Sequence, residues 1–134
     1  MRTLPLLLTA LAASLAPSGR AAPVAASRPP TVTWSFATHT DPDLTPHSRV
    51  FLRVNGKRIP VYETTATFQT LRRRDYKDHG VPSSAVAACS GWFAGQGDDL
   101  YVVRHGGRLV VFMRELDEQA DTTPYKWLKS IPVD

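Results

Sequence analysis

The sequence predicts an α+β fold with a predominantly antiparallel sheet, and two observations support this. Two stretches of β-branched and aromatic residues, each interrupted by a short turn, predict β-hairpins at about residues 49–64 and 100–116. Between them, a segment with helix-capping residues predicts a short helical middle at about residues 70–90. Strands on both sides of helices are typical of an α+β domain, and a small all-β barrel or sandwich is the alternative.

The turn of the first hairpin is the strongest local signal. Asn55 and Gly56 tolerate the positive φ angles of a type I′ turn, whose twist matches that of the flanking strands. Pro60 cannot donate a ladder hydrogen bond, so the second strand is expected to lie at an edge or to carry a bulge there. Upstream, residues 31–37 alternate apolar and polar side chains, which predicts a half-buried strand.

The helical middle is predicted from its end signals. Thr70 can cap a first short helix, and Gly80 can close it in the left-handed conformation. Pro82 can begin a second short helix, and Gly91 can end it. Each helix would have only about two turns, so both are expected to depend on tertiary packing.

The second hairpin and the C-terminal segment complete the predicted sheet. Gly106 and Gly107 supply the turn between two runs of β-branched and aromatic residues. After an acidic polar loop, residues 125–131 are expected to form a last strand rather than a short helix. Residues 31–134 are therefore predicted to fold as a single globular domain.

The N-terminus resembles a secretory leader in its pattern. A charged start, a short apolar centre and small residues predict a cleavable signal peptide over residues 1–26, with cleavage after Ala21 as the alternative to Ala26. The apolar centre is shorter than the roughly 20 residues that span a bilayer. The protein is therefore expected to be exported, periplasmic or secreted, with a disordered segment at residues 27–30 and no stable membrane span after cleavage.

Charge and cysteine content limit the partners. Without Arg2 and Arg20, the chain has 14 Lys and Arg against 12 Asp and Glu, and this net charge of +2 is too small to argue for nucleic acid or an anionic membrane as the target. Cys89 is the only cysteine, so no intrachain disulfide can form even in an oxidising compartment. The expected partner is an unidentified protein or small ligand.

Residues 91–99 form the candidate binding loop. Three glycines allow close backbone approach, while Trp92 and Phe93 offer flat apolar surface, and Asp98 and Asp99 offer hydrogen-bond acceptors. The alternative is an aromatic anchor for the core followed by a tight turn. The segment is not a P-loop, because it lacks the closing Gly-Lys-Ser/Thr and precedes a strand.

Cys89 is the candidate nucleophile of a competing hypothesis, a small cysteine-dependent hydrolase. His79 or His105 would have to act as its base. Against this, the predicted position of Cys89 near a helix C-terminus would raise its pKa, and a buried structural thiol is the alternative.

Other residue patterns are candidates for carbohydrate, catalytic or metal sites. Carbohydrate could stack on the three tryptophans, but two of them, Trp34 and Trp127, are expected in the core. Paired carboxylates cannot be nominated, because adjacent Asp98 and Asp99 would point to opposite faces of a strand. His39, Asp41, Asp43 and His47 could cluster in one loop as metal ligands. The acids Glu115, Asp117 and Glu118 are expected to be solvated. The basic run of Arg72, Arg73 and Arg74 is a candidate phosphate or polyanion patch, with a solvated helix face as the alternative.

These observations favour a non-enzymatic binding or interaction module that uses Trp92, Phe93, Asp98 and Asp99. The sequence indicates no catalytic set, no cofactor and no metal site. Ligand identity and oligomeric state are left open.

Overall fold

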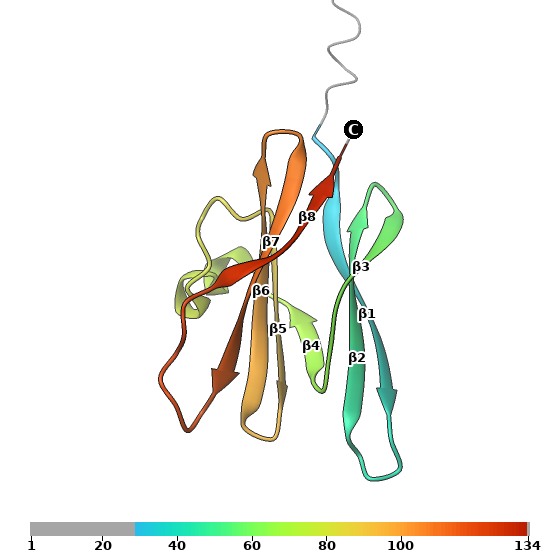
Figure 1. Ribbon diagram of the computed structural model, residues 1–134, viewed down its shortest axis with the longest axis vertical. Coiled ribbons are helices and arrows are strands. Elements are labelled where there is room, and N and C mark those ends of the chain that lie inside the picture. The colour runs from blue at the N-terminus through green and yellow to red at the C-terminus, as the bar shows by residue number, and fades with distance from the viewer. Residues whose placement is uncertain (1–28, 134) are drawn as a thin grey trace, which may run out of the picture.

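The computed structural model describes residues 29–133, which form eight strands in two antiparallel sheets (Figure 1). Within each sheet, every strand pairs with the next strand along the chain, and the chain passes between the sheets after β3. The elements are β1 (Val32–Thr40), β2 (Pro46–Val54), β3 (Lys57–Thr64), β4 (Thr67–Thr70), η4 (Arg73–Asp75), η5 (Lys77–His79), β5 (Ala87–Phe93), β6 (Gln96–His105), β7 (Arg108–Asp117) and β8 (Lys126–Pro132).

The three-stranded sheet, β1-β2-β3, follows the predicted hairpin. Asn55 and Gly56 have φ angles of 51° and 86°, as the two central residues of a type I′ turn require. The β2–β3 register shifts between Val50 and Phe51, and Phe51 pairs with Pro60. Because β3 is also an edge strand, the proline lies where both expectations placed it. The hairpin at 49–64 and the strand at 31–37 are thus confirmed.

The five-stranded sheet, β4-β5-β6-β7-β8, contains the second predicted hairpin and the last strand. His105 pairs with Arg108 across a two-residue turn in which Gly106 has a positive φ. The hairpin is longer than predicted, because β6 begins at Gln96 rather than near residue 100. Its β5 partner turns into it through Ala94 and Gly95, which both have positive φ.

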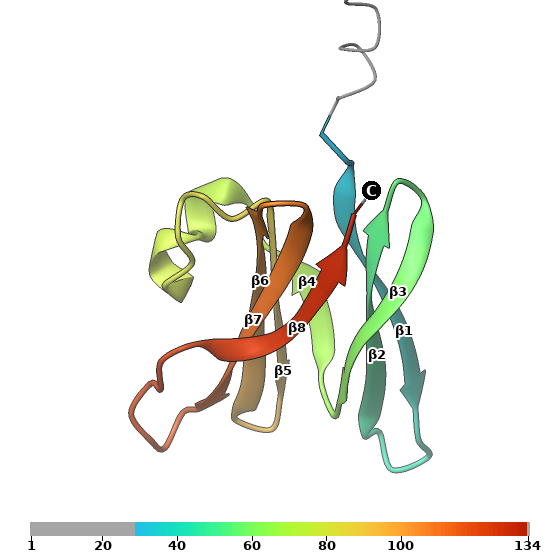
Figure 2. The same cartoon turned by 45° about the horizontal axis from the view of Figure 1, so that its top comes forward.

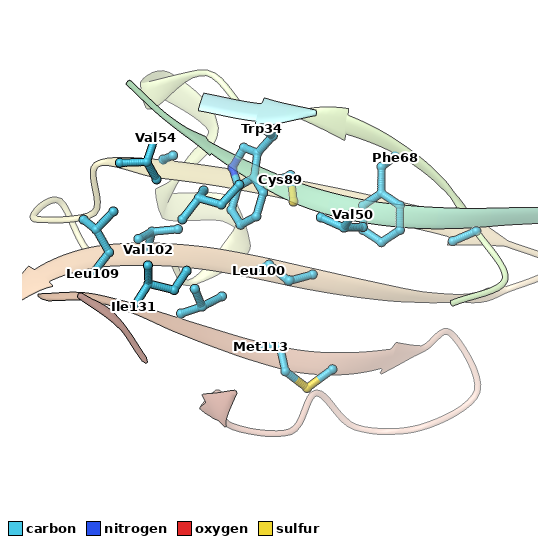
Figure 3. Close-up of a cluster of buried hydrophobic side chains, with 14 residues drawn as sticks. Trp34, Val50, Val54, Phe68, Cys89, Leu100, Val102, Leu109, Met113 and Ile131 are labelled. Atoms are coloured by element: carbon cyan, nitrogen blue, oxygen red, sulfur yellow. The ribbon is translucent and has the colours of Figure 1, made fainter. Parts of the chain in front are cut away.

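The main core lies between the two sheets (Figure 3). Residues at every second position of each strand face inward, as the two-residue period of a strand requires. Trp34 contributes its indole from β1, and Cys89 lies among the aliphatic side chains of β5 and β6. The buried members are Trp34, Val50, Leu52, Val54, Ala66, Phe68, Ala87, Cys89, Leu100, Val102, Leu109, Val111, Met113 and Ile131.

The predicted α+β fold with a helical middle at 70–90 is wrong. The residues after Thr70 form two short 3₁₀ turns, η4 and η5, and no α-helix occurs in the described residues. Gly80 does close η5 in the left-handed conformation, with φ 64°. The all-β sandwich, the alternative reading of the sequence, fits the structure.

Two physical reasons explain the error. In the first predicted helix, the buried residues Leu71 and Tyr76 are five apart, and Val81, just after it, is five further on, so the three cannot share one stripe of an α-helix. In the second, Ala87 and Cys89 face the main core while Ala88 faces the opposite side, so an alanine-rich run is a strand buried on both faces. Tertiary packing therefore overrides helix propensity.

Residues 71–86 cover part of the outer face of the five-stranded sheet (Figure 2). Their buried side chains pack on Ala88, Tyr101 and Val103, forming a second, smaller core. Tyr101 stacks on Phe112 and meets Tyr125 edge to face, with centroids 5.2 Å and 4.6 Å away. This covered face positions the candidate site.

The leader predicted at residues 1–26 lies outside the described residues, as do residues 27 and 28 of the predicted disordered segment. Within the part that is described, no helix is long and apolar enough to cross a membrane.

Candidate functional site

Asp98 and Asp99 are adjacent in β6 and lie on opposite faces of the sheet. Asp98 pairs across the strands with Gly91 and Glu115, whereas Asp99 pairs with Ser90 and Arg114. Both aspartates are buried. The predicted acceptor pair is therefore divided between two surfaces, as strand alternation requires.

Asp99 is the centre of a charged cluster on the covered outer face. Its side chain is fully buried, and its Oδ2 atom lies 3.2 Å from Nδ1 of His79 and 3.2 Å from a terminal nitrogen of Arg114. Because an ionised carboxylate only accepts hydrogen bonds, Nδ1 carries the proton in the first contact. The His79 side chain is 28% exposed.

The same cluster fixes the end of η5 to the sheet. Both Arg114 and the Tyr125 hydroxyl donate to the backbone carbonyl of His79, at 2.7 Å each. The Arg114 guanidinium also lies over the Tyr125 ring, 4.6 Å from its centroid. Burial, followed by the nearby Asp99 charge, raises the pKa of Tyr125, so the tyrosine stays a donor. His79 is thus held through both its side chain and its backbone.

Trp92 forms a wall beside this cluster. It is the second-last residue of β5 and pairs with Gly97, and a Cβ at Gly97 would lie 2.8 Å from the indole Cδ2. The indole therefore lies directly over the bare backbone of Gly97, and its side chain is 43% exposed. A flat aromatic surface is left open toward the loop that follows β7.

The charged cluster and Trp92 line a common pocket of about 320 Å³. This volume is at the lower end of the range of about 300–1,000 Å³ that small-molecule sites occupy. Four lining carboxylates face one arginine, so the lining carries an excess of negative charge. The lining residues are Asp78, His79, Trp92, Asp99, Arg114, Leu116, Asp117, Glu118, Ala120 and Thr122.

Asp98 belongs to a separate pocket of about 400 Å³, at the mouth between the sheets. The hydroxyls of Tyr62 and Thr64 donate to its two oxygens at 3.0 Å and 3.1 Å. Burial raises the pKa of Asp98 and outweighs these two hydrogen bonds. Burial, with the nearby Asp98 charge, also raises the pKa of Tyr62.

The segment predicted as a binding loop, residues 91–99, is the β5–β6 hairpin. A Cβ at Gly91 would lie 2.7 Å from the Phe68 ring, so the chain itself occupies the space over this glycine. Gly97 is covered in the same way by Trp92. Phe93 lies at the end of β5, half exposed, and alternates to the face opposite Trp92. Of the four predicted site residues, the structure brings only Trp92 and Asp99 to one pocket.

Cys89 and His79, the proposed nucleophile and base of a hydrolase, lie on opposite faces of the five-stranded sheet. Cys89 faces the main core and is fully buried, whereas His79 contacts Asp99 on the outer face. Burial, reinforced by the charges of Asp99 and Asp98, raises the pKa of the Cys89 thiol. His105 lies exposed at the β6–β7 turn. This geometry gives the hydrolase hypothesis no support.

The structure also places the weaker candidates. His39 and His47 contact the two oxygens of Asp41 at 3.2 Å and 2.8 Å, but no group of three ligand side chains in residues 29–133 is arranged to hold a metal ion. Trp34 is in the core as expected. Trp127 is 62% exposed on the edge strand β8, so its predicted core position is wrong.

The roles of Arg114 and Tyr125 were missed by sequence reasoning. Asp99 lies in a strand whose next residues are apolar, and a carboxylate in such a strand needs a buried cationic partner. That signal could have suggested an arginine on the neighbouring strand. Tyr125 lies 46 residues from His79, and no local pattern joins them.

Comparison with known proteins shows no relative of this chain: no family model matches it, and neither does any curated protein or solved structure.

Proposed function

We propose that this protein is an exported, non-enzymatic binding module that holds a small organic cation against Trp92. The cation would be an amine, a quaternary ammonium or the basic side chain of a partner. The observation that carries the proposal is the open indole face of Trp92 in a pocket with an acidic lining. Cations are attracted both to the face of an indole ring and to carboxylates.

The charge of the lining supports a cation rather than an anion. Asp99 is already neutralised by Arg114 at 3.2 Å. Asp78, Asp117 and Glu118 remain, and all three are exposed. None of these three forms an ion pair within residues 29–133. An anionic ligand would meet repulsion from all three carboxylates, which makes the pocket selective for positive charge.

The pocket residues His79 and Trp92 are held in place, which supports binding with little reorganisation. The 71–86 segment is tied to the sheet where Arg114 and Tyr125 both donate to the carbonyl of His79. Trp92 is limited on one side by the Gly97 backbone. Groups that are already held in place lose little conformational entropy when a ligand binds.

Among residues 29–133, no serine, threonine or cysteine side chain is hydrogen-bonded to the His79 ring, which supports binding rather than catalysis. Ser90 is the cross-strand partner of Asp99, but its hydroxyl is buried and makes no hydrogen bond within the described residues. A catalytic serine would be expected to contact its base and be open to substrate. Cys89 faces the other side of the sheet.

An NMR titration tests the ligand class. The indole N–H signals of Trp34, Trp92 and Trp127 would be followed while choline is added, with glucuronate as the anionic comparison. Choline is expected to shift the Trp92 signal and leave that of buried Trp34 unchanged, and glucuronate is expected to shift neither. A Trp92 signal that moves with glucuronate but not with choline would refute the proposed ligand class.

A further inference from the structure

Positive charge is concentrated at one end of the molecule. Figures 1 and 2 show that the β2–β3 and β6–β7 turns lie at the same end. The exposed side chains there include Arg53, Lys57, Arg58, Arg104 and Arg108. Residues 49–62 and 100–114, which form these two hairpin ends, contain no Asp or Glu.

Arg53 and Arg58 lie directly opposite each other on β2 and β3. They share the outer face of the three-stranded sheet, because their neighbours Leu52 and Val54 point into the core. Like charges in direct cross-strand opposition are destabilising. An anion placed between the two guanidinium groups would remove this repulsion.

Internal contacts hold both arginines in position. The Arg58 guanidinium lies 3.9 Å from the centroid of the Phe51 ring, and Arg53 donates to the carbonyl of Gly56 at 3.3 Å. Neither arginine forms an ion pair with a carboxylate in the described part of the chain. Their remaining N–H groups are free for a ligand, in the planar fork that matches a phosphate group.

The neighbouring hairpin extends the positive surface. Among residues 29–133, Arg104 donates to the Pro30 carbonyl and Arg108 donates to Ser130, so the hydrogen-bond partners of both arginines there are neutral. Lys57 follows the β2–β3 turn and is exposed. Several cations spread over two hairpin ends fit several phosphates more closely than one.

We propose that this basic end, defined by Arg53, Lys57, Arg58, Arg104 and Arg108, binds clustered phosphate groups. The phosphates can belong to anionic lipid headgroups or to a soluble polyphosphate, since both present the same chemistry. The turns, Asn55-Gly56 and Gly106-Gly107, carry no apolar side chain that could enter a bilayer. Binding is therefore electrostatic and decreases steeply with salt.

The experiment measures binding to two probes as a function of salt. One is a set of vesicles of phosphatidylglycerol and phosphatidylcholine, followed by co-sedimentation, and the other is sodium tripolyphosphate, followed by calorimetry. The variant R53Q/R58Q is expected to bind at least about tenfold more weakly. The slope of log affinity against log salt concentration is expected to fall by about two. The matched control R72Q/R74Q removes the same charge from exposed arginines elsewhere and is expected to bind like the unmodified protein.

Each result has a defined meaning. Binding to vesicles alone assigns the lipid source, binding to tripolyphosphate alone assigns the soluble source, and binding to both supports the shared chemistry. If neither probe binds at low salt, or if R72Q/R74Q loses as much affinity as R53Q/R58Q, the proposal is wrong. Binding of a duplex oligonucleotide when both probes fail would overturn it as well. R104Q/R108Q, on the other hairpin, provides a second variant that should also weaken binding.

Discussion

The Nδ1 atom of His79 lies 3.2 Å from the buried Oδ2 atom of Asp99, which joins the end of η5 to the middle of the five-stranded sheet. This contact crosses 20 residues of sequence. It places an imidazole beside the exposed Trp92 and forms part of the wall of the proposed cation site. The stability of the fold and the geometry of the site therefore depend on the same carboxylate.

Replacement of Asp99 by Asn should strongly destabilise the protein. Asp99→Asn leaves the largely buried Arg114 guanidinium without its counter-charge, and breaking a buried ion pair costs about 3–5 kcal/mol. Urea unfolding followed by circular dichroism would measure the loss. The exposed Asp78→Asn change is the control and should alter stability by less than about 0.5 kcal/mol. Equal effects of the two changes would contradict the central role of Asp99.

Replacement of Gly97 by Ala should displace Trp92. A Cβ at this position would lie 2.3 Å from the carbonyl oxygen of Gly91 and 2.8 Å from the Trp92 ring, so the backbone or the indole must move. The expected loss is at least about 2 kcal/mol, with a changed indole N–H shift. Gly107→Ala is the matched control, since nothing lies within 4 Å of its Cβ position. An unchanged Trp92 signal in Gly97→Ala would show that the indole does not lie on this glycine.

The ionisation of Asp98 should make stability fall as pH rises through the acidic range. Burial raises its pKa, so the folded protein holds this proton more tightly than the unfolded chain, in which the pKa is about 3.9. Between about 3.9 and the folded pKa, the folded state binds more protons, and the free energy of unfolding decreases with increasing pH.

Comparison with Asp98→Asn isolates this contribution from those of other groups. The stability of the unmodified protein relative to the variant should decrease from about pH 3.5 upward, in urea titrations at successive pH values. A difference that grows with pH would mean that the hydrogen bonds from Tyr62 and Thr64 outweigh burial.

The Cys89 thiol should be unreactive in the folded protein. It is fully buried between the sheets, and burial raises its pKa, so the thiolate is scarce and inaccessible at pH 7. Modification by a disulfide reagent should become rapid only when urea unfolds the chain. Rapid modification of the native protein, with an apparent pKa below the usual value of about 8.5, would contradict this and revive the hydrolase hypothesis.

How far the fold could be predicted depended on whether its signals were local. The Asn55-Gly56 turn could be identified because two adjacent residues determine its backbone geometry. The β5 strand could not, because both its faces are buried and Ala87, Ala88 and Cys89 show no alternation between apolar and polar residues. A tight turn within residues 91–99 was the alternative to a binding loop, but its position could not be given, because its first central residue, Ala94, is of a type that rarely adopts positive φ.

The candidate site was less predictable than the fold. Trp92 and Asp99 were both named from the sequence, but their common pocket depends on the pairing of β5 with β6. His79 was considered only as a base for Cys89, because its distance from Asp99 follows from the way residues 71–86 pack on the sheet. The basic end was not predicted, because the total charge is nearly neutral. It forms only when folding brings the β2–β3 and β6–β7 turns, from two separate hairpins, to the same end of the molecule.

The affinity of choline for the protein and for the variants Trp92→Ala and Trp127→Ala tests the central claim most directly. Both tryptophans are exposed, so the two variants remove similar aromatic surface, but only Trp92 lines the pocket. Trp92→Ala should weaken choline binding by about tenfold, within the range of a cation–π contact, and Trp127→Ala should leave the dissociation constant unchanged. Choline binding that survives in Trp92→Ala, or that is lost in Trp127→Ala, would contradict the account.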